Sequence, residues 1–199
     1  MPITLLENFR AVFYTPFYAA MALEAYAAEG LDVHFETSSQ PLAAHALLSG
    51  QGQVAWGGPI RAMRANDQDP DYGMVIFCEV VGRDPFFLLG REPHASFQVE
   101  ALLDYKIATV SEVPTPWICL QHDLRLAGCD PAAVERIADR SMPENVAALR
   151  AGEVEVIQVF QPFVEQVLED NAGHIWYAAA NRGPAAYTSF YTSREMVER

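Results

Sequence analysis

The residues best suited to bind a small molecule gather directly after the first apolar run, Ile3-Thr4-Leu5-Leu6. Residues 8–18 hold five aromatic rings and no glycine or cysteine, and they include the candidate contacts Asn8, Phe9, Arg10 and Tyr14. Rings at this density can stack on a flat solute, and an arginine can hold a carboxylate or sulfonate through two hydrogen bonds. The same rings also suit a core, and Arg10 also suits an ordinary surface.

Further candidates follow other apolar runs in the same way. The sequence Trp56-Gly57-Gly58-Pro59 removes side chains just before an expected helix, so backbone N–H groups can approach a ligand closely. It is not a phosphate loop, because the chain contains neither GxxxxGK[ST] nor GxGxxG. The other candidates are Ser38, Glu79, Ser111, Thr115, Gln158 and Gln161, of which Glu79 also suits a plain strand-end carboxylate.

The sequence contains no spacing of residues that is typical of a catalytic site or a metal site. Cys78, Cys119 and Cys129 are too scattered for a disulfide framework or a zinc site, and we expect them to be small buried residues. The five histidines form no pattern with serine, cysteine or carboxylates that spacing can support. We therefore expect a protein that is not an enzyme and that uses no metal and no cofactor.

The charge balance excludes several partners. The formal net charge is −13, and Lys106 is the single lysine, so the basic surface that nucleic acid or an anionic membrane requires is missing. No apolar run reaches the roughly 18 residues of a membrane span, so we expect no membrane insertion. The first residues have no features of a signal peptide. We expect a cytoplasmic location for the chain as written, and a periplasmic one if a signal has been removed.

Strand patterns alternate with helical patterns along the chain, which predicts an α/β fold with mostly parallel sheets flanked by helices. Strands are expected at 3–6, 31–37, 54–56, 74–81, 86–89, 106–110, 134–138, 156–160 and 187–192. Helices are expected at 17–29, 41–48, 60–65, 117–127, 144–149 and 163–168, and Ser193 can cap a short last helix.

Two lobes are the simplest organisation of these elements. The spacing Ala46-Leu47-x2-Gly50-x3-Val54 recurs as Ala148-Leu149-x2-Gly152-x3-Val156, and the composition turns polar near residue 91. We assign residues 1–90 and 184–199 to one lobe and 91–183 to the other. Prolines that start helices are Pro16, Pro41, Pro59, Pro116, Pro143 and Pro162. In parallel sheets such helix starts follow the strand ends where ligands bind.

Three segments resemble a known family. They are Asn8-Phe9-x7-Phe17-Tyr18-x-Ala20, Glu29-Gly30-Leu31-Asp32-Val33, and Leu48-Ser49-Gly50-x3-Val54-x2-Gly57-Gly58. Together they look like the SsuA/THI5-like (NMT1/THI5-like) solute-binding proteins, which have the type II periplasmic-binding-protein fold. The resemblance implies a two-lobed clamp, and it also implies a chain truncated at its C-terminus, since members commonly continue further.

The resemblance further implies a function. Members bind thiamin-pyrimidine precursors, alkyl or aryl sulfonates, nitrate or taurine, usually as the substrate-binding component of an ABC importer. We therefore expect a small planar or anionic organic ligand, such as a pyrimidine, sulfonate or carboxylate, and an ABC transporter permease as partner. The alternative is a cytoplasmic enzyme of thiamin-pyrimidine or aromatic-acid metabolism on the same fold, although the cysteines that such relatives use are missing from residues 8–16. A sensory module is a third reading.

Overall fold

The computed structural model describes residues 2–38 and 43–198, and the side chains of residues 43 and 44 are not described. The chain divides into two compact units. Unit 1 comprises residues 1–83 and 184–199, and unit 2 comprises residues 84–183. The expected lobe boundary at residue 90 differs from this division, because the strand that covers residues 87–90 pairs only with strands of unit 2.

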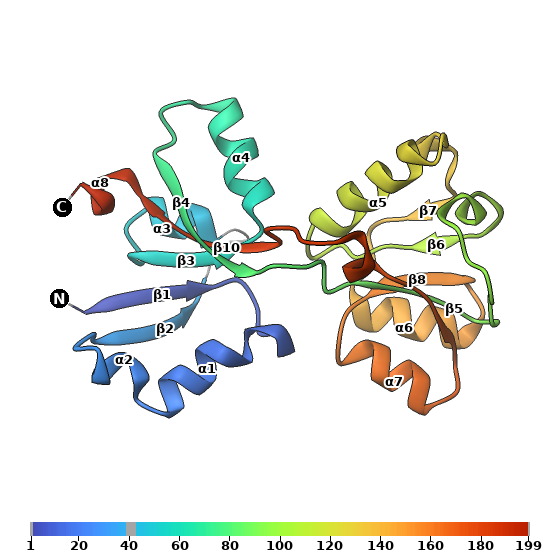
Figure 1. Cartoon of the computed structure of the whole chain (residues 1–199), viewed down its shortest axis with the longest axis horizontal. Coiled ribbons are helices and arrows are strands. Elements are labelled where there is room, and N and C mark those ends of the chain that lie inside the picture. Colours follow the sequence, from blue (N-terminus) through green and yellow to red (C-terminus); the bar gives the residue numbers. More distant parts are fainter. Residues whose placement is uncertain (1, 39–42, 199) are drawn as a thin grey trace. The chain divides into compact units, whose positions relative to one another are not determined.

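Unit 1 is built on a five-stranded sheet with the order β2-β1-β3-β10-β4 (Figure 1). Its strands are β1 (Ile3–Glu7), β2 (Val33–Thr37), β3 (Val54–Gly57), β4 (Met74–Val81) and β10 (Thr188–Ser193). The pairs β1/β2 and β1/β3 are parallel, whereas β10 runs antiparallel to both β3 and β4. One reversed strand therefore lies inside an otherwise parallel sheet.

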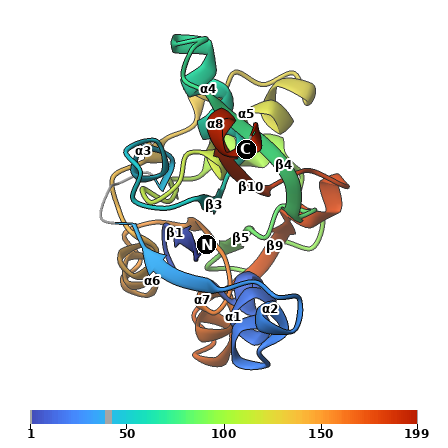
Figure 2. The same ribbon diagram turned by 90° about the vertical axis from the view of Figure 1, so that its left-hand side faces the viewer.

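The two faces of the unit 1 sheet carry different side chains. The helices α3 (Ala43–Leu48) and α4 (Pro59–Gln68) cover one face, where Leu6, Ala55 and Tyr191 join an aliphatic core. The helices α1 (Thr15–Ala22) and α2 (Ala25–Ala28) lie on the opposite side (Figures 1 and 2). There Phe17 packs on the rings of Trp56 and Phe190, at centroid distances of 4.8 and 5.1 Å.

Unit 2 repeats this plan with the strand order β7-β6-β8-β5-β9. Its strands are β5 (Phe87–Gly90), β6 (Ile107–Ala108), β7 (Arg136–Ile137), β8 (Val156–Val159) and β9 (His174–Ala178). Here β5 is the reversed strand, antiparallel to β8 and β9, while β6 pairs in parallel with β7 and β8. The prediction of mostly parallel sheets flanked by helices is confirmed.

Helices cover both faces of the unit 2 sheet. The helix α5 (Thr115–Leu126) lies on one side, and α6 (Met142–Ala151) and α7 (Phe163–Glu169) lie on the other (Figure 1). Short 3-10 helices span Val12–Tyr14 and Ala179–Arg182 among other places, and a last helix, α8 (Arg194–Val197), returns to unit 1. Ser193 caps α8 as expected, because its hydroxyl accepts a hydrogen bond from the Met196 N–H at 3.2 Å.

Three expectations were wrong in detail. The single helix expected over 17–29 is two short helices, because Glu24 adopts a left-handed backbone with φ of 55° between α1 and α2. The strand β9 was not predicted. The cysteines are not buried as expected, because Cys78 is exposed on the edge strand β4 and Cys119 and Cys129 are half-buried. Pro41 lies outside the described residues, whereas Pro16, Pro59, Pro116 and Pro143 occupy first turns as predicted.

Candidate functional site

In unit 1 the ends of β1 and β3 bring three predicted residues together. Asn8 follows β1, and its Nδ2 donates to the Trp56 carbonyl at 3.2 Å, which fixes the loop to β3. Gly57 ends β3 and Gly58 is the N-cap of α4, which has no side-chain cap. A Cβ at position 57 would overlap the Tyr191 hydroxyl, so packing explains this glycine without any ligand.

One ring of the aromatic loop, Tyr14, belongs to the core, and the other four rings are half-buried. Tyr14 is 4% exposed, and its hydroxyl lies 3.2 Å from the Thr188 hydroxyl. Burial raises the pKa of Tyr14 to about 12. Its ring also lies 6.1 Å from that of Phe9, so the two predicted contacts are neighbours. The packing of Tyr14 favours the core reading of this residue over direct contact with a solute.

A buried carboxylate that the sequence reading missed organises the same loop. Glu7, the last residue of β1, is 2% exposed, and its side chain accepts hydrogen bonds from Arg10, Tyr18 and Thr37. Its backbone carbonyl accepts from the N–H of Ser38, which follows β2. The predicted residues Arg10 and Ser38 are thus both tied to Glu7.

Glu79 lies level with the end of β3, because Ser189 of β10 pairs with Gly57 on one side and with Glu79 on the other. It is an exposed residue of the edge strand β4, and β10 separates it from β3. Its carboxylate approaches the backbone at Gly82. Glu79 is therefore one strand removed from Gly57 at the same end of the sheet.

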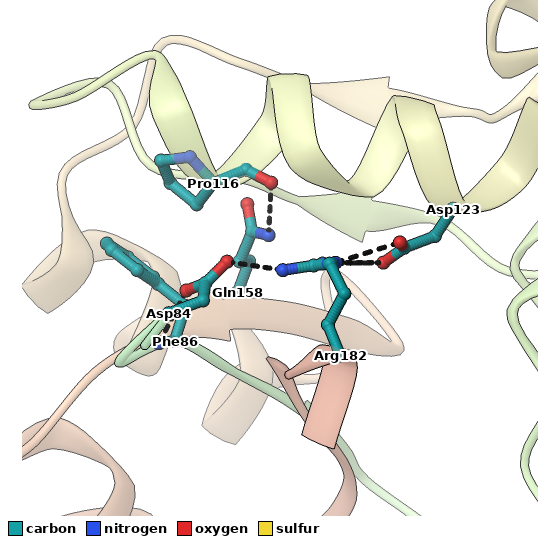
Figure 3. Close-up of polar contacts among 6 residues, drawn as sticks. All are labelled: Asp84, Phe86, Pro116, Asp123, Gln158 and Arg182. Atoms are coloured by element: carbon teal, nitrogen blue, oxygen red, sulfur yellow. Dashed lines mark hydrogen bonds and ion pairs between the residues drawn. The ribbon is translucent and has the colours of Figure 1, made fainter. Parts of the chain in front are cut away.

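In unit 2, Gln158 connects β8 to the start of α5 (Figure 3). Its Nε2 donates to the Pro116 carbonyl at 3.1 Å, and the residue is 3% exposed. Its Oε1 is buried and has no hydrogen-bond partner among the described residues. Thr115, the first residue of α5, is 6% exposed, and α5 has no side-chain cap. An acceptor and a helix N-terminus therefore meet at this strand end.

The remaining unit 2 candidates lie nearby in the sequence but make local bonds. Ser111 is exposed, and its N–H donates to the Arg140 carbonyl at 3.0 Å. Gln161 exchanges two hydrogen bonds with Glu165 in the first turn of α7, at 2.8 and 3.3 Å. Gln161 therefore serves the start of α7 in the same way that a cap does.

The helix α6 shows what a fully capped start looks like. Ser141 and Glu144 form a capping box, and the Glu112 carboxylate accepts from the Met142 N–H at 2.9 Å. These side chains occupy the donors that a helix N-terminus leaves open. The starts of α4 and α5 have no such side chains. The start of α6 is therefore purely structural, whereas the N–H groups at the starts of α4 and α5 can donate to an acceptor on a ligand.

An ion cluster beside Gln158 had no signal in the sequence (Figure 3). Arg182 donates to Asp84 at 2.8 Å and to both carboxylate oxygens of Asp123. These three residues lie far apart along the chain. Burial acts to lower the pKa of Arg182, and its hydrogen bonds to Asp123 and Asp84 outweigh burial and raise it. The guanidinium is therefore committed to these two carboxylates and not to a ligand.

Within residues 2–38 and 43–198, histidine, cysteine, aspartate and glutamate side chains form no cluster able to hold a metal ion. The helices of the same described part are all too short or too polar to cross a bilayer.

Comparison with known proteins identifies similar chains. A protein named "Putative binding protein YtlA" from Bacillus subtilis strain 168 is 22% identical over 200 residues, which cover 99% of this chain. This chain spans 60% of the length of that relative.

Solved structures share the fold. The periplasmic aliphatic sulphonate binding protein SsuA from Escherichia coli matches with a TM-score of 0.79 at 15% identity, over 99% of this chain and 66% of that one. The ligand-binding component of an ABC-type import system from Staphylococcus aureus matches with a TM-score of 0.71 at 14% identity, over 100% and 68%. These similar proteins are binding proteins rather than enzymes. A model of the NMT1-like family matches residues 89–198, which is more than half of the sequence, and the chain therefore belongs to the NMT1-like family.

Proposed function

We propose that this protein binds a small organic solute as the substrate-binding component of an ABC-type importer. The ligand sites lie at the carboxyl ends of the parallel strands, where β1 and β3 end in unit 1 and β8 ends in unit 2. Family membership and the binding proteins that share the fold support this function. A periplasmic location follows from the same proposal.

One observation carries the assignment most strongly, the unpartnered Oε1 of Gln158. A buried acceptor without a donor costs about 1–3 kcal/mol, and a solute that donates to it recovers that free energy. Gln158 holds that oxygen in place through its Nε2 bond to Pro116, beside the uncapped start of α5. A solute that donates to Oε1 and accepts from the α5 N–H groups satisfies both.

Unit 1 offers a related arrangement. The Asn8 amide donates to the backbone just before α4, as the Gln158 amide donates within the first turn of α5. Pro59 is the first residue of α4 and Pro116 is the second residue of α5, and neither helix has a side-chain cap. Helix N-termini favour anionic or acceptor-rich groups, which supports a solute that bears a sulfonate, carboxylate or phosphonate.

A thermal-shift screen followed by calorimetry tests the function. The panel contains alkyl and aryl sulfonates, carboxylates, phosphonates and aminopyrimidines, and a bound solute raises the melting temperature. We expect Gln158→Leu to weaken a solute found in this way by about tenfold, because it removes the free acceptor.

Gln166→Leu is the matched control, because Gln166 is exposed on α7. It should leave the affinity unchanged. A panel in which no solute binds would overturn the function, and conversion of a bound solute to product, detected by mass spectrometry, would replace it with the enzymatic alternative.

A further inference from the structure

A groove of about 450 Å³ lies between α1 and β2 in unit 1. Its walls are Tyr18, Met21 and Ala22 from α1, and Val33 and Phe35 from β2, with Arg10 also lining it. Since Glu7 pairs with Thr37 and Ile3 with Val33, the contact of Arg10 with Glu7 places it toward the carboxyl end of β2. The groove thus has apolar walls and a cation toward one end.

Glu7 determines where that cation lies. Its Oε1 accepts from the Arg10 Nε at 3.3 Å and from the Thr37 hydroxyl at 3.2 Å, and its Oε2 accepts from the Tyr18 hydroxyl at 2.8 Å. A carboxylate buried to this degree needs such donors, because desolvating its charge is costly. One buried group therefore connects β1, β2, α1 and the loop that carries Arg10.

Arg10 remains able to bind a further group. Its guanidinium carbon lies 5.8 Å from the centre of the Tyr18 ring, and its side chain is 82% exposed. Within the described residues only its Nε is used, so Nη1 and Nη2 have no hydrogen-bond partner there. These two nitrogens match the two oxygens of a carboxylate or sulfonate.

The other charged groups near the groove are occupied. The Glu7 carboxylate already accepts three hydrogen bonds, so it offers little to a cationic ligand. His34 also lines the groove, and its Nε2 lies 3.0 Å from Asp32. Arg10 is ion-paired with Glu7 through its Nε, and its Nη1 and Nη2 remain as charged donors, so a ligand acid can accept two charge-assisted hydrogen bonds there.

We propose, on the basis of the solute-binding function above, that this groove selects amphipathic organic anions. The acid group binds the Nη atoms of Arg10, and the apolar body lies along Tyr18, Met21 and Phe35. Glu7 is a positioning residue, which acts through Arg10 and does not touch the ligand.

Calorimetric titrations with three probes that share one tail test the selectivity. The probes are hexane-1-sulfonate, hexan-1-ol and hexylamine. Wild-type protein should bind the sulfonate about tenfold more tightly than the alcohol, and the amine most weakly. Arg10→Gln should remove that preference, while Arg64→Gln, which changes an exposed arginine on α4, should keep it. Ala22→Phe should fill the groove and weaken both the sulfonate and the alcohol.

Glu7→Gln separates positioning from simple electrostatics. Removing a negative charge near an anion strengthens its binding if charge alone matters, whereas loss of the Arg10 anchor weakens it. We expect sulfonate affinity to fall about three- to tenfold while hexanol affinity stays unchanged, which also shows that the groove remains folded.

Three results would overturn the assignment: equal affinity of wild-type protein for sulfonate and alcohol, no effect of Arg10→Gln, or tighter sulfonate binding by Glu7→Gln. If the solute screen still finds a ligand that depends on Gln158, the solute-binding function survives and this groove alone is rejected.

Discussion

The two units share a sheet topology but differ in how completely their helices cover the sheet. Among the described residues, eight of the eleven exposed large hydrophobic side chains lie in unit 1, including Leu23 at 79% and Phe77 at 54%. The helices α1 and α2 bury no residue fully, whereas α5 buries four and α6 five. Unit 2 is therefore the better covered of the two units, and unit 1 is a sheet with thinner cover.

The difference shows that strand order alone does not secure a parallel sheet. Such a sheet needs apolar cover on both faces, and the stability of each unit depends on the area that its helices remove from water. Unit 2 gains this cover from the residues that α5 and α6 bury, and the ion pairs of Arg182 with Asp84 and Asp123 add to its stability. Unit 1 depends on contacts between aromatic rings and on the hydrogen bonds around Glu7. Substitutions should therefore be costlier in unit 2.

The largest effect should come from Arg182→Met. This change leaves Asp84, which is 2% exposed, and Asp123 without their cation, and breaking a buried pair costs about 3–5 kcal/mol. Hydrogen exchange followed by mass spectrometry should show faster exchange throughout residues 84–183.

Arg150→Met is the matched control, because its ion pair with Asp170 lies on the surface of the same unit. It should cost less than about 1 kcal/mol. Equal effects of the two variants would mean that the buried cluster does not stabilise unit 2.

The second-largest loss of stability should come from removing a buried side chain of unit 2. Leu124→Ala on α5 deletes a side chain with 0% exposure and should lower the free energy of unfolding of unit 2 by about 3 kcal/mol. Leu23→Ala in unit 1 should change stability by less than about 0.5 kcal/mol. Urea unfolding measures both, and a comparable loss at Leu23 would contradict the thin cover of unit 1.

Alkaline pH should affect unit 1 through Tyr14. Its pKa is about 12 in the folded chain and 10.0 in an unfolded one, so folding holds its proton more tightly. The resulting stability is present below pH 10 and is lost as pH rises from 10 to 12, amounting to about 2–3 kcal/mol at most. Tyr14→Phe should remove this part of the pH dependence in urea unfolding, and an unchanged slope would mean that Tyr14 is not buried in solution.

The smallest predicted effect concerns the cap of α6. Ser141→Ala removes a capping-box partner and should cost about 1 kcal/mol. Urea unfolding measures this loss, and an unchanged free energy of unfolding would mean that the capping box does not stabilise α6.

The fold was predictable where single residues set the backbone. Glycine ends α6 at Gly152, which has φ of 76°, and Ser193 caps α8, so local chemistry fixed these boundaries. The break at Glu24 was not predictable, because glutamate normally continues a helix. The strand β9 lacks the alternation of a half-buried strand, and pairing with β5 determines it.

The sequence predicted where along the chain the site residues lie, but not which atoms they contact. Strand ends followed by proline located Asn8, Gly57, Thr115 and Gln158, but nothing in the sequence indicates that Gln158 binds the Pro116 carbonyl. Glu7 was missed because a glutamate that ends a strand normally lies in water, and its burial depends on donors from α1 and β2. The contact between Arg182 and Asp84 joins residues 98 positions apart, for which one sequence carries no signal.

The reversed strand β10 sets an order for biosynthesis. Its place between β3 and β4 is filled by residues 188–193, which leave the ribosome after every strand of unit 2. The uninterrupted segment 84–183 can therefore assemble its sheet while β4 still lacks its neighbour. The part of the protein that is translated first should be the last to reach its native state.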